Sequence, residues 1–162
     1  MAKKFGGSTP ATVALTEAGV AFSAHAYEHD PAVASYGLEA AQVLGLPAEQ
    51  VFKTLLADVD GELVVAIVPV SGKLDLKALA AAVGGKRADM ADAKLAERTT
   101  GYVVGGISPL GQRKRLRTVL DETAILYDTV YVSGGRRGFD LGLSPDDLLT
   151  LTDGTTAAVA RD

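Results

Sequence analysis

The fold is decided by residues 51–70, which read VFKTLLADVDGELVVAIVPV. Two runs rich in branched apolar side chains, residues 51–58 and 62–70, have the composition of β-strands. Between them, Asp60-Gly61 supplies the turn chemistry of a β-hairpin. The stretch therefore predicts two antiparallel strands joined by a tight turn.

Helices are expected on both sides of this hairpin. They begin at side chains that can accept the first backbone N–H groups of a helix, and several end at a glycine. The expected helices cover residues 9–18, 35–44, 76–83 and 92–98, with a last one starting at Ser144. Further short strands are expected at residues 20–27, 102–104, 118–120, 129–133 and 155–160. Because helices do not regularly separate these strands, the pattern predicts an α/β domain with a mixed sheet.

Length and composition restrict the chemistry. The chain has 162 residues, of which 48% are apolar and 22% charged, as in a single globular domain. It has no cysteine, which excludes a disulfide, a thiolate metal site, an iron–sulfur cluster and a catalytic thiol of its own. The net charge of −4 argues against bulk attraction to nucleic acid or to anionic membranes.

The positive charge is concentrated, since all eight arginines lie in the second half of the chain. The densest basic stretch contains Arg113, Lys114, Arg115 and Arg117, and a second pair follows at residues 136–137. These side chains either form a solvated surface or contact phosphates, for which the planar guanidinium is well suited. Composition alone leaves both interpretations open.

Residues 1–8 are expected to be a short extension before the domain, which covers residues 9–162. This extension has no apolar core, so it does not resemble a secretory signal. The longest apolar run, residues 63–70, is far shorter than the roughly 20 residues that span a bilayer. We therefore expect a cytoplasmic protein with no membrane partner.

Both histidines lie in HAYEHDP, residues 25–31. If the segment is a strand, His25 and His29 share a face but stand roughly 13 Å apart along the chain. One metal ion would not bridge them without a sharp bend, so no metal site is predicted. A metal-dependent hydrolase remains an alternative that depends on these two side chains alone.

Three other segments carry candidate chemistry. Lys53 is either an edge lysine that reaches water or a cation placed in an apolar pocket, where it could bind a phosphate or carbonyl oxygen. GYVVGGISPLG, residues 101–111, is either a tight turn that needs glycine or a loop whose N–H groups meet an anion. VYVSGGRRGFD, residues 130–140, repeats this device and ends at Asp140, which could also simply pair with an arginine.

HAYEHDP, FKTLL, TGYVVGGISPLGQRKRL and VYVSGGRRGFDL occur together and in this order. The set resembles the YbaK family of aminoacyl-tRNA deacylases, which are related to the editing insertion domain of bacterial prolyl-tRNA synthetase. The resemblance covers residues 9–162. It implies a compact α/β fold with a mixed, strongly curved sheet, and the hydrolysis, in trans, of cysteine wrongly attached to proline tRNA. No cofactor is implied.

The same resemblance implies a set of site residues. Lys53 corresponds to an essential lysine, and Tyr27 and Asp140 to residues implicated at the pocket. Other pocket residues implied in this way are Tyr36, Thr54, Gly105, Gly106, Ile107, Ser108, Pro109 and Ser133. Tyr36 stands where the family usually has phenylalanine, and its hydroxyl bears on amino-acid selectivity. The expected tRNA contacts are Arg113, Lys114, Arg115, Arg117, Arg136 and Arg137.

The mechanism that the resemblance implies is substrate-assisted: the thiol of the bound cysteine attacks its own ester and expels the tRNA. The expected partners are the aminoacyl-tRNA and prolyl-tRNA synthetase, with Cys-tRNA(Cys) as a second substrate. Two alternatives remain open besides the metal hydrolase. One is a deacylase of the same fold acting on alanine or serine esters. The other is a non-catalytic module that binds tRNA or a synthetase.

Overall fold

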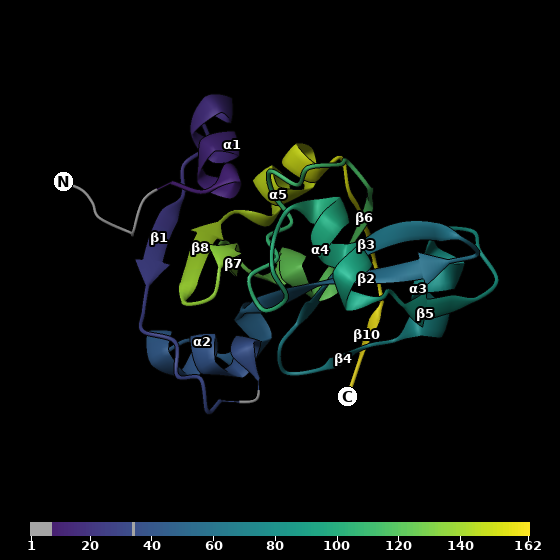
Figure 1. The fold of residues 1–162 in the computed structure, drawn as a ribbon, viewed down its shortest axis with the longest axis horizontal. Coiled ribbons are helices and arrows are strands. Elements are labelled where there is room, and N and C mark those ends of the chain that lie inside the picture. Colours follow the sequence, from purple (N-terminus) through teal and green to yellow (C-terminus); the bar gives the residue numbers. More distant parts are fainter. Residues whose placement is uncertain (1–7, 34) are drawn as a thin grey trace.

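The computed structural model describes residues 8–33 and 35–162 (Figure 1). Of the expected extension, residues 1–8, all but Ser8 lie outside the described residues. The helices are α1 (Pro10–Ala18), α2 (Tyr36–Leu44), η1 (Ala48–Gln50), α3 (Leu76–Ala82), α4 (Ala93–Thr100), η2 (Glu122–Leu126) and α5 (Pro145–Thr152), where η marks a 3₁₀-helix. The strands are β1 (Ser23–Ala26), β2 (Phe52–Val59), β3 (Glu62–Pro69), β4 (Lys73–Leu74), β5 (Ala88–Met90), β6 (Arg117–Asp121), β7 (Val130–Arg136), β8 (Phe139–Leu143), β9 (Thr155–Ala157) and β10 (Ala160–Arg161).

These strands confirm a mixed sheet in an α/β domain. The largest sheet has the order β5-β2-β3-β6-β9, with β2 antiparallel to β3 and β5 and with β6 parallel to β3 and β9. A second sheet, β1-β8-β7, is antiparallel, and β10 pairs with β4 in a short ribbon. The strands are thus divided among three sets, and the single strongly curved sheet that was expected is not formed. Figure 1 shows the three-stranded sheet on one side of the molecule and the β2–β3 hairpin on the other.

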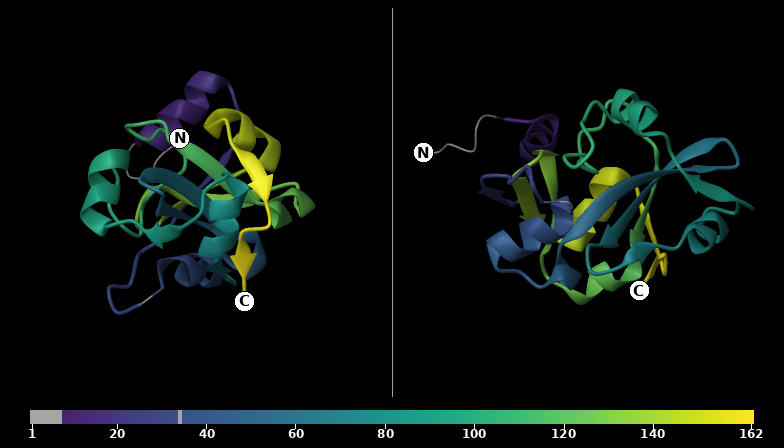
Figure 2. Two further views of the ribbon diagram at one scale, coloured as in Figure 1. Left: turned by 90° about the vertical axis from the view of Figure 1, so that its right-hand side faces the viewer. Right: turned by 60° about the horizontal axis from the view of Figure 1, so that its bottom comes forward.

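The predicted hairpin is confirmed, and its turn explains its register. Asp60 and Gly61 have φ of 51° and 92°, so both central residues are left-handed, as a type I′ turn requires. Val59 therefore pairs with Glu62, and the pairing continues to Phe52 and Pro69. Figure 2 shows this hairpin at one end of the domain, beside α3.

The helix starts are confirmed in every case where a cap was predicted. The caps Thr9, Ser35, Asp75, Asp92 and Ser144 each accept a backbone N–H from the first turn of their helix. Helix α4 runs two residues beyond the expected end because the left-handed cap is Gly101, with φ of 84°. No helix among the described residues is long and apolar enough to cross a membrane.

Two strand predictions are wrong, one for a local reason and one because of long-range pairing. Residues 102–104 form a turn, because Gly101 and Gly105 both have positive φ and Gly106 N donates to Val103 O at 2.8 Å. The segment after the Arg136-Arg137 pair was not expected to be a strand, yet β8 lies between β1 and β7. Asp140 therefore lies on a central strand and not in a loop.

Two apolar cores lie on opposite faces of the large sheet. Phe52 and Leu56 of β2 point into the larger core, which also holds side chains from α1, α5, β7 and β8. Ala57 and Val59 point into the smaller core, which α3 covers. Since side chains alternate along a strand, Thr54 faces the larger core, and Lys53 and Leu55 face the other way.

Beside the pairing of β9 with β6, a buried carboxylate of β6 binds the C-terminal segment. Asp121 is 2% exposed, and its Oδ1 accepts from the backbone N–H groups of Val159 and Ala160, both at 3.0 Å. Its Oδ2 accepts from the Thr123 amide. The carboxylate thereby satisfies backbone donors that would otherwise be buried without a partner.

Replacing Asp121 with alanine is expected to lower the free energy of unfolding by about 2–4 kcal/mol, because two backbone N–H groups lose a charged acceptor. Urea denaturation of the variant measures this loss. The exposed Asp128→Ala serves as the matched control and is expected to stay within about 0.5 kcal/mol of the native chain. Equal midpoints for the two variants would contradict the role of Asp121.

Candidate active site

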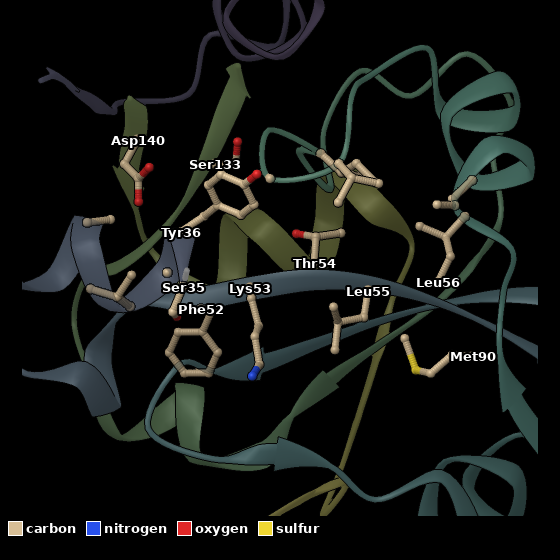
Figure 3. Close-up of a pocket in the computed structure, with 18 of the residues that line it drawn as sticks. Ser35, Tyr36, Phe52, Lys53, Thr54, Leu55, Leu56, Met90, Ser133 and Asp140 are labelled. Carbon is tan, nitrogen blue, oxygen red and sulfur yellow. The ribbon is translucent and has the colours of Figure 1, made fainter. Parts of the chain in front are cut away.

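The candidate site lies along the outer edge of β2, where the strand lacks a continuous neighbour. On that edge β5 pairs with β2 only from Ala57 to Val59, and Val51 forms an isolated bridge to Tyr131. Between these two contacts, β2 borders a cavity of about 450 Å³ (Figure 3). Leu56 O accepts from Ala91 N on this edge, and by the alternation of the ladder the backbone of Thr54 faces the same way.

A buried hydroxyl faces the cavity without a partner. Thr54 is 8% exposed, and its Oγ1 has no hydrogen-bond partner among the described residues. Buried polar atoms are nearly always hydrogen-bonded, so an exception in a cavity wall calls for an explanation. A bound group that donates or accepts a hydrogen bond at this point would supply one.

Asp140 lies at another part of the same cavity, on β8. It stands opposite Ser133 of β7 and His25 of β1, and it is 7% exposed. Burial raises its pKa to about 7, so at neutral pH the carboxyl is poised between its charged and neutral forms. Burial, and then the charges of Asp140 and Glu39, raise the pKa of Tyr27, whose hydroxyl therefore stays neutral.

Lys53 also lines the cavity, but it points away from these groups. Figure 3 shows its side chain below β2, with Thr54, Ser133 and Asp140 above the strand. Its Nζ donates to Gly72 O at 2.9 Å, and burial followed by repulsion from Lys73 lowers its pKa. An ammonium has three donors, so two remain for a ligand.

The glycine loop is divided between the cavity wall and the protein interior. Gly105 and Ile107 line the cavity, together with Tyr36 and Ser133. Ser108, which was expected in the pocket, is fully buried, and its Oγ accepts from Leu110 N at 3.2 Å. Pro109, also expected there, borders a separate hollow between α1 and α5. Gly106 lies behind the wall, where its N–H is already bonded to Val103 O.

The predicted basic residues do not form one surface. Arg117 pairs with Glu62 at 2.7 Å and donates to Val83 O, at the far end of the sheet. Arg113 donates to Arg98 O at the end of α4, and Arg115 lies by Leu151 O of α5. The guanidinium of Arg136 stacks over Phe139. Arg137 reaches the pocket rim, where it lies over the Tyr36 ring.

The two histidines have separate partners. His25 Nε2 lies 2.8 Å from Ser23 Oγ, and the His25 ring meets the Tyr131 ring edge-on. His29 Nδ1 lies 2.7 Å from Oε1 of Glu39, which is 5% exposed. The Asp30 amide and then His29 lower the pKa of Glu39. Within the described residues no three His, Cys, Asp or Glu side chains are grouped to hold a metal ion.

Sequence reasoning missed the apolar wall of the cavity and the role of Glu39. Leu56, Met90, Ala93 and Ala96 provide much of that wall. The sequence shows that α4 carries small side chains, but only the structure shows that Ala93 and Ala96 line the cavity beside β2. Glu39 lies in the first turn of α2, where an acid is common. Nothing in the sequence therefore indicated that this side chain is buried.

The fold and site together define an α/β domain with a cavity lined by an apolar wall, a titratable carboxyl and a lysine. The model of the aminoacyl-tRNA editing domain matches residues 30–151. The chain therefore belongs to the aminoacyl-tRNA editing domain family, as the sequence motifs predicted.

Individual relatives agree with this assignment. The chain is 42% identical over 121 residues to "Putative Cys-tRNA(Pro)/Cys-tRNA(Cys) deacylase EbsC" of Enterococcus faecalis, covering 74% of this chain and 73% of that protein. It is 31% identical over 100 residues to the proline–tRNA ligase of Maridesulfovibrio salexigens, covering 62% of this chain and 17% of the ligase. A solved structure described as "a putative trans-editing enzyme for prolyl tRNA synthetase" superposes with a TM-score of 0.80 at 26% identity, covering 94% of this chain and 96% of that one.

The raised pKa of Asp140 predicts a pH dependence of stability. Between about pH 4 and 7 the unfolded carboxyl is ionised, whereas the folded one keeps its proton. Unfolding then releases a proton, so the free energy of unfolding falls as the pH rises through this window and levels off above it. Between pH 4 and pH 8 the free energy of unfolding of the native chain should therefore fall by up to about 4 kcal/mol relative to that of Asp140→Asn, which does not titrate at this position.

Urea denaturation of both proteins from pH 4 to pH 8 measures this difference. Other titrating groups are common to the two chains and cancel in the comparison. Parallel stability curves would show that Asp140 titrates near its ordinary pKa.

Proposed function

We propose that this chain is a trans-acting deacylase that hydrolyses cysteine esters of tRNA, with Cys-tRNA(Pro) as main substrate and Cys-tRNA(Cys) as a second. The family assignment and the relative named for these two substrates support the reaction class. The observation that carries the proposal is the Thr54 hydroxyl, which has no partner among the described residues and faces a small cavity. The largely buried carboxyl of Asp140 lines the same cavity. Such a cavity suits an aminoacyl group, which is small and has both polar and apolar parts.

Asp140 is proposed to bind the α-ammonium group of the substrate. A buried carboxylate with a raised pKa is unfavourable alone, and a cation beside it stabilises the charged form. The apolar wall formed by Leu56, Ala93 and Ala96 would then receive the side chain. Thr54 Oγ1 would gain its missing hydrogen bond from the aminoacyl group. This arrangement favours a small residue and disfavours a large one.

The proposed chemistry uses the substrate's own thiol, since the chain contains no cysteine. The sulfur attacks the ester carbon, the bond from that carbon to the ribose oxygen breaks, and the thiol proton passes to the leaving oxygen. Water then opens the cyclic thioester. A tethered nucleophile has a high effective concentration, so orientation is the main task of the protein.

Two parts of the chain would orient the ester. Because the Gly106 amide is bonded to Val103 O, we assign the contact with the ester carbonyl to the Gly105 amide in the cavity wall. Lys53 would hold the terminal ribose with the donors that Gly72 O leaves unused. Since Lys53 and Asp140 lie on opposite sides of β2, the ester would sit across the open strand edge between them.

The test compares hydrolysis of Cys-tRNA(Pro), Ala-tRNA(Pro) and Ser-tRNA by the native chain and two variants. Only the cysteine ester should be hydrolysed efficiently, because the others have no thiol. Lys53→Ala is expected to lower kcat/KM about 10- to 100-fold, as for a lost hydrogen bond to a charged group. Thr54→Val is expected to lower kcat/KM about three- to tenfold while leaving the midpoint of urea denaturation unchanged, because its hydroxyl has no partner among the described residues.

Equal turnover of the three esters would refute the thiol mechanism. Full activity of Lys53→Ala would remove that lysine from the site. Binding of tRNA without ester turnover would favour a non-catalytic module.

The basic residues separate into testable groups. Arg113 and Lys114 follow the glycine loop and are exposed, so they are proposed to contact the acceptor stem, helped by the synthetase where affinity is low. Neutralising both should weaken tRNA binding and reduce the slope of log K against log salt concentration by about one to two. Arg117→Ala should leave the slope unchanged because Glu62 already pairs with its guanidinium. Equal slopes for all three proteins would assign Arg113 and Lys114 to a solvated surface.

A further inference from the structure

One arginine of the basic set is engaged with the cavity wall itself. Arg137, at the tip of the β7–β8 hairpin, donates from Nε to Val104 O at 2.9 Å. Its guanidinium carbon lies 4.9 Å from the centre of the Tyr36 ring. Val104 and Tyr36 both line the cavity, so the side chain connects two walls that are 68 residues apart in the chain.

Behind Arg137, neither Gly105 nor Gly106 has space for a side chain. A Cβ on Gly105 would lie 2.8 Å from carbons of the Tyr36 ring and 3.0 Å from Arg137 Nε. A Cβ on Gly106 would lie 2.7–2.8 Å from backbone atoms of residues 136–137. The glycine loop and the hairpin tip therefore touch backbone to backbone, with Arg137 covering the outer side of the contact.

Each end of this contact is fixed to the rest of the fold. The Val104 amide donates to Glu97 Oε2 at 2.8 Å, which ties the turn to α4. The Tyr36 ring lies 5.2 Å from the His29 ring, and His29 is held by buried Glu39. The hairpin tip is aimed at the loop by a bulge between Ser133 and Arg136.

We propose that Arg137 and Tyr36 form a clasp that holds the Val104–Gly105 backbone in its place in the cavity wall. Arg137 is then a positioning residue for the Gly105 amide, and its main role is not the tRNA contact that its position in the basic set predicts. Both features of guanidinium are used, since the planar group stacks on the ring while Nε–H binds the carbonyl. This inference rests on the proposed deacylase function for its effect on turnover, but not for its effect on the loop.

The first test needs no substrate. Amide hydrogen exchange of residues 104–107 is measured in the native chain, Arg137→Ala, Arg137→Lys and Tyr36→Leu. Lysine keeps the charge but has neither the flat face nor Nε–H in that position, so all three variants should exchange faster, by about tenfold. Tyr36→Phe keeps the ring and should match the native chain. Arg87→Ala, which removes an exposed arginine paired with exposed Asp89, is the matched control and should also match it.

The second test is kinetic, on Cys-tRNA(Pro). Arg137→Ala and Arg137→Lys should both lower kcat about tenfold, with KM and the salt dependence unchanged, because a displaced amide affects the reacting ester and not the tRNA. The double variant with Tyr36→Leu should lose little more than either single variant, since the two side chains act as one unit.

Either of two results would overturn the clasp. One is native exchange rates in Arg137→Ala. The other is near-native kcat in Arg137→Lys together with a salt slope that falls by about one in Arg137→Ala, which would assign Arg137 to a phosphate. If the native chain hydrolyses no cysteine ester, the proposed function fails, and the exchange measurement still decides whether the clasp exists.

Discussion

The site depends on a gap in the hydrogen-bonding of β2. The strand is paired along its whole length with β3, but on its outer edge it meets β5 only at residues 57–59 and β7 only at Val51. If another strand were paired along this whole edge, β2 would be an ordinary interior strand of the sheet. The gap instead leaves backbone groups facing a cavity, and it makes side chains from both faces of the strand accessible from one space, Thr54 above and Lys53 below. The small side chains of α4 keep that space from being filled.

The electrostatics of the site follow from the same arrangement. Asp140 lies on the central strand of the antiparallel sheet, where water is excluded, and no basic group near it compensates enough to keep its pKa low. Elsewhere the fold treats buried acids differently: Glu39 receives the Asp30 amide and His29, and Asp121 receives three backbone donors. Among the described residues Asp140 receives no such donors, and its place in the cavity wall suits the proposed binding of a cationic group.

Local chemistry made much of the fold predictable. The turn at Asp60-Gly61 and the five helix caps depend on neighbouring residues, and all of them are found in the structure. The failure to predict β8 and the separation of the basic residues have the opposite origin, because they depend on contacts between distant parts of the chain. Strand β8 exists because β1 and β7 flank it. The basic stretch reads as one unit in sequence, yet Arg113 and Arg117 have different neighbours, because Arg117 is the first residue of β6 and Arg113 lies in the loop before it.

The two Gly-Gly pairs show how far a motif can be interpreted without a structure. Both pairs could be read as loops with exposed amides, but all four glycines are also needed for close packing. Gly106 touches the backbone of residues 136–137, Gly134 touches the Phe139 ring, and Gly135 touches the Tyr102 ring. Gly105 alone combines a left-handed φ with a place in the cavity wall. The glycines therefore allow two loops that are distant in the sequence to pack closely, and the position of the Gly105 amide depends on these contacts and not on its own sequence alone.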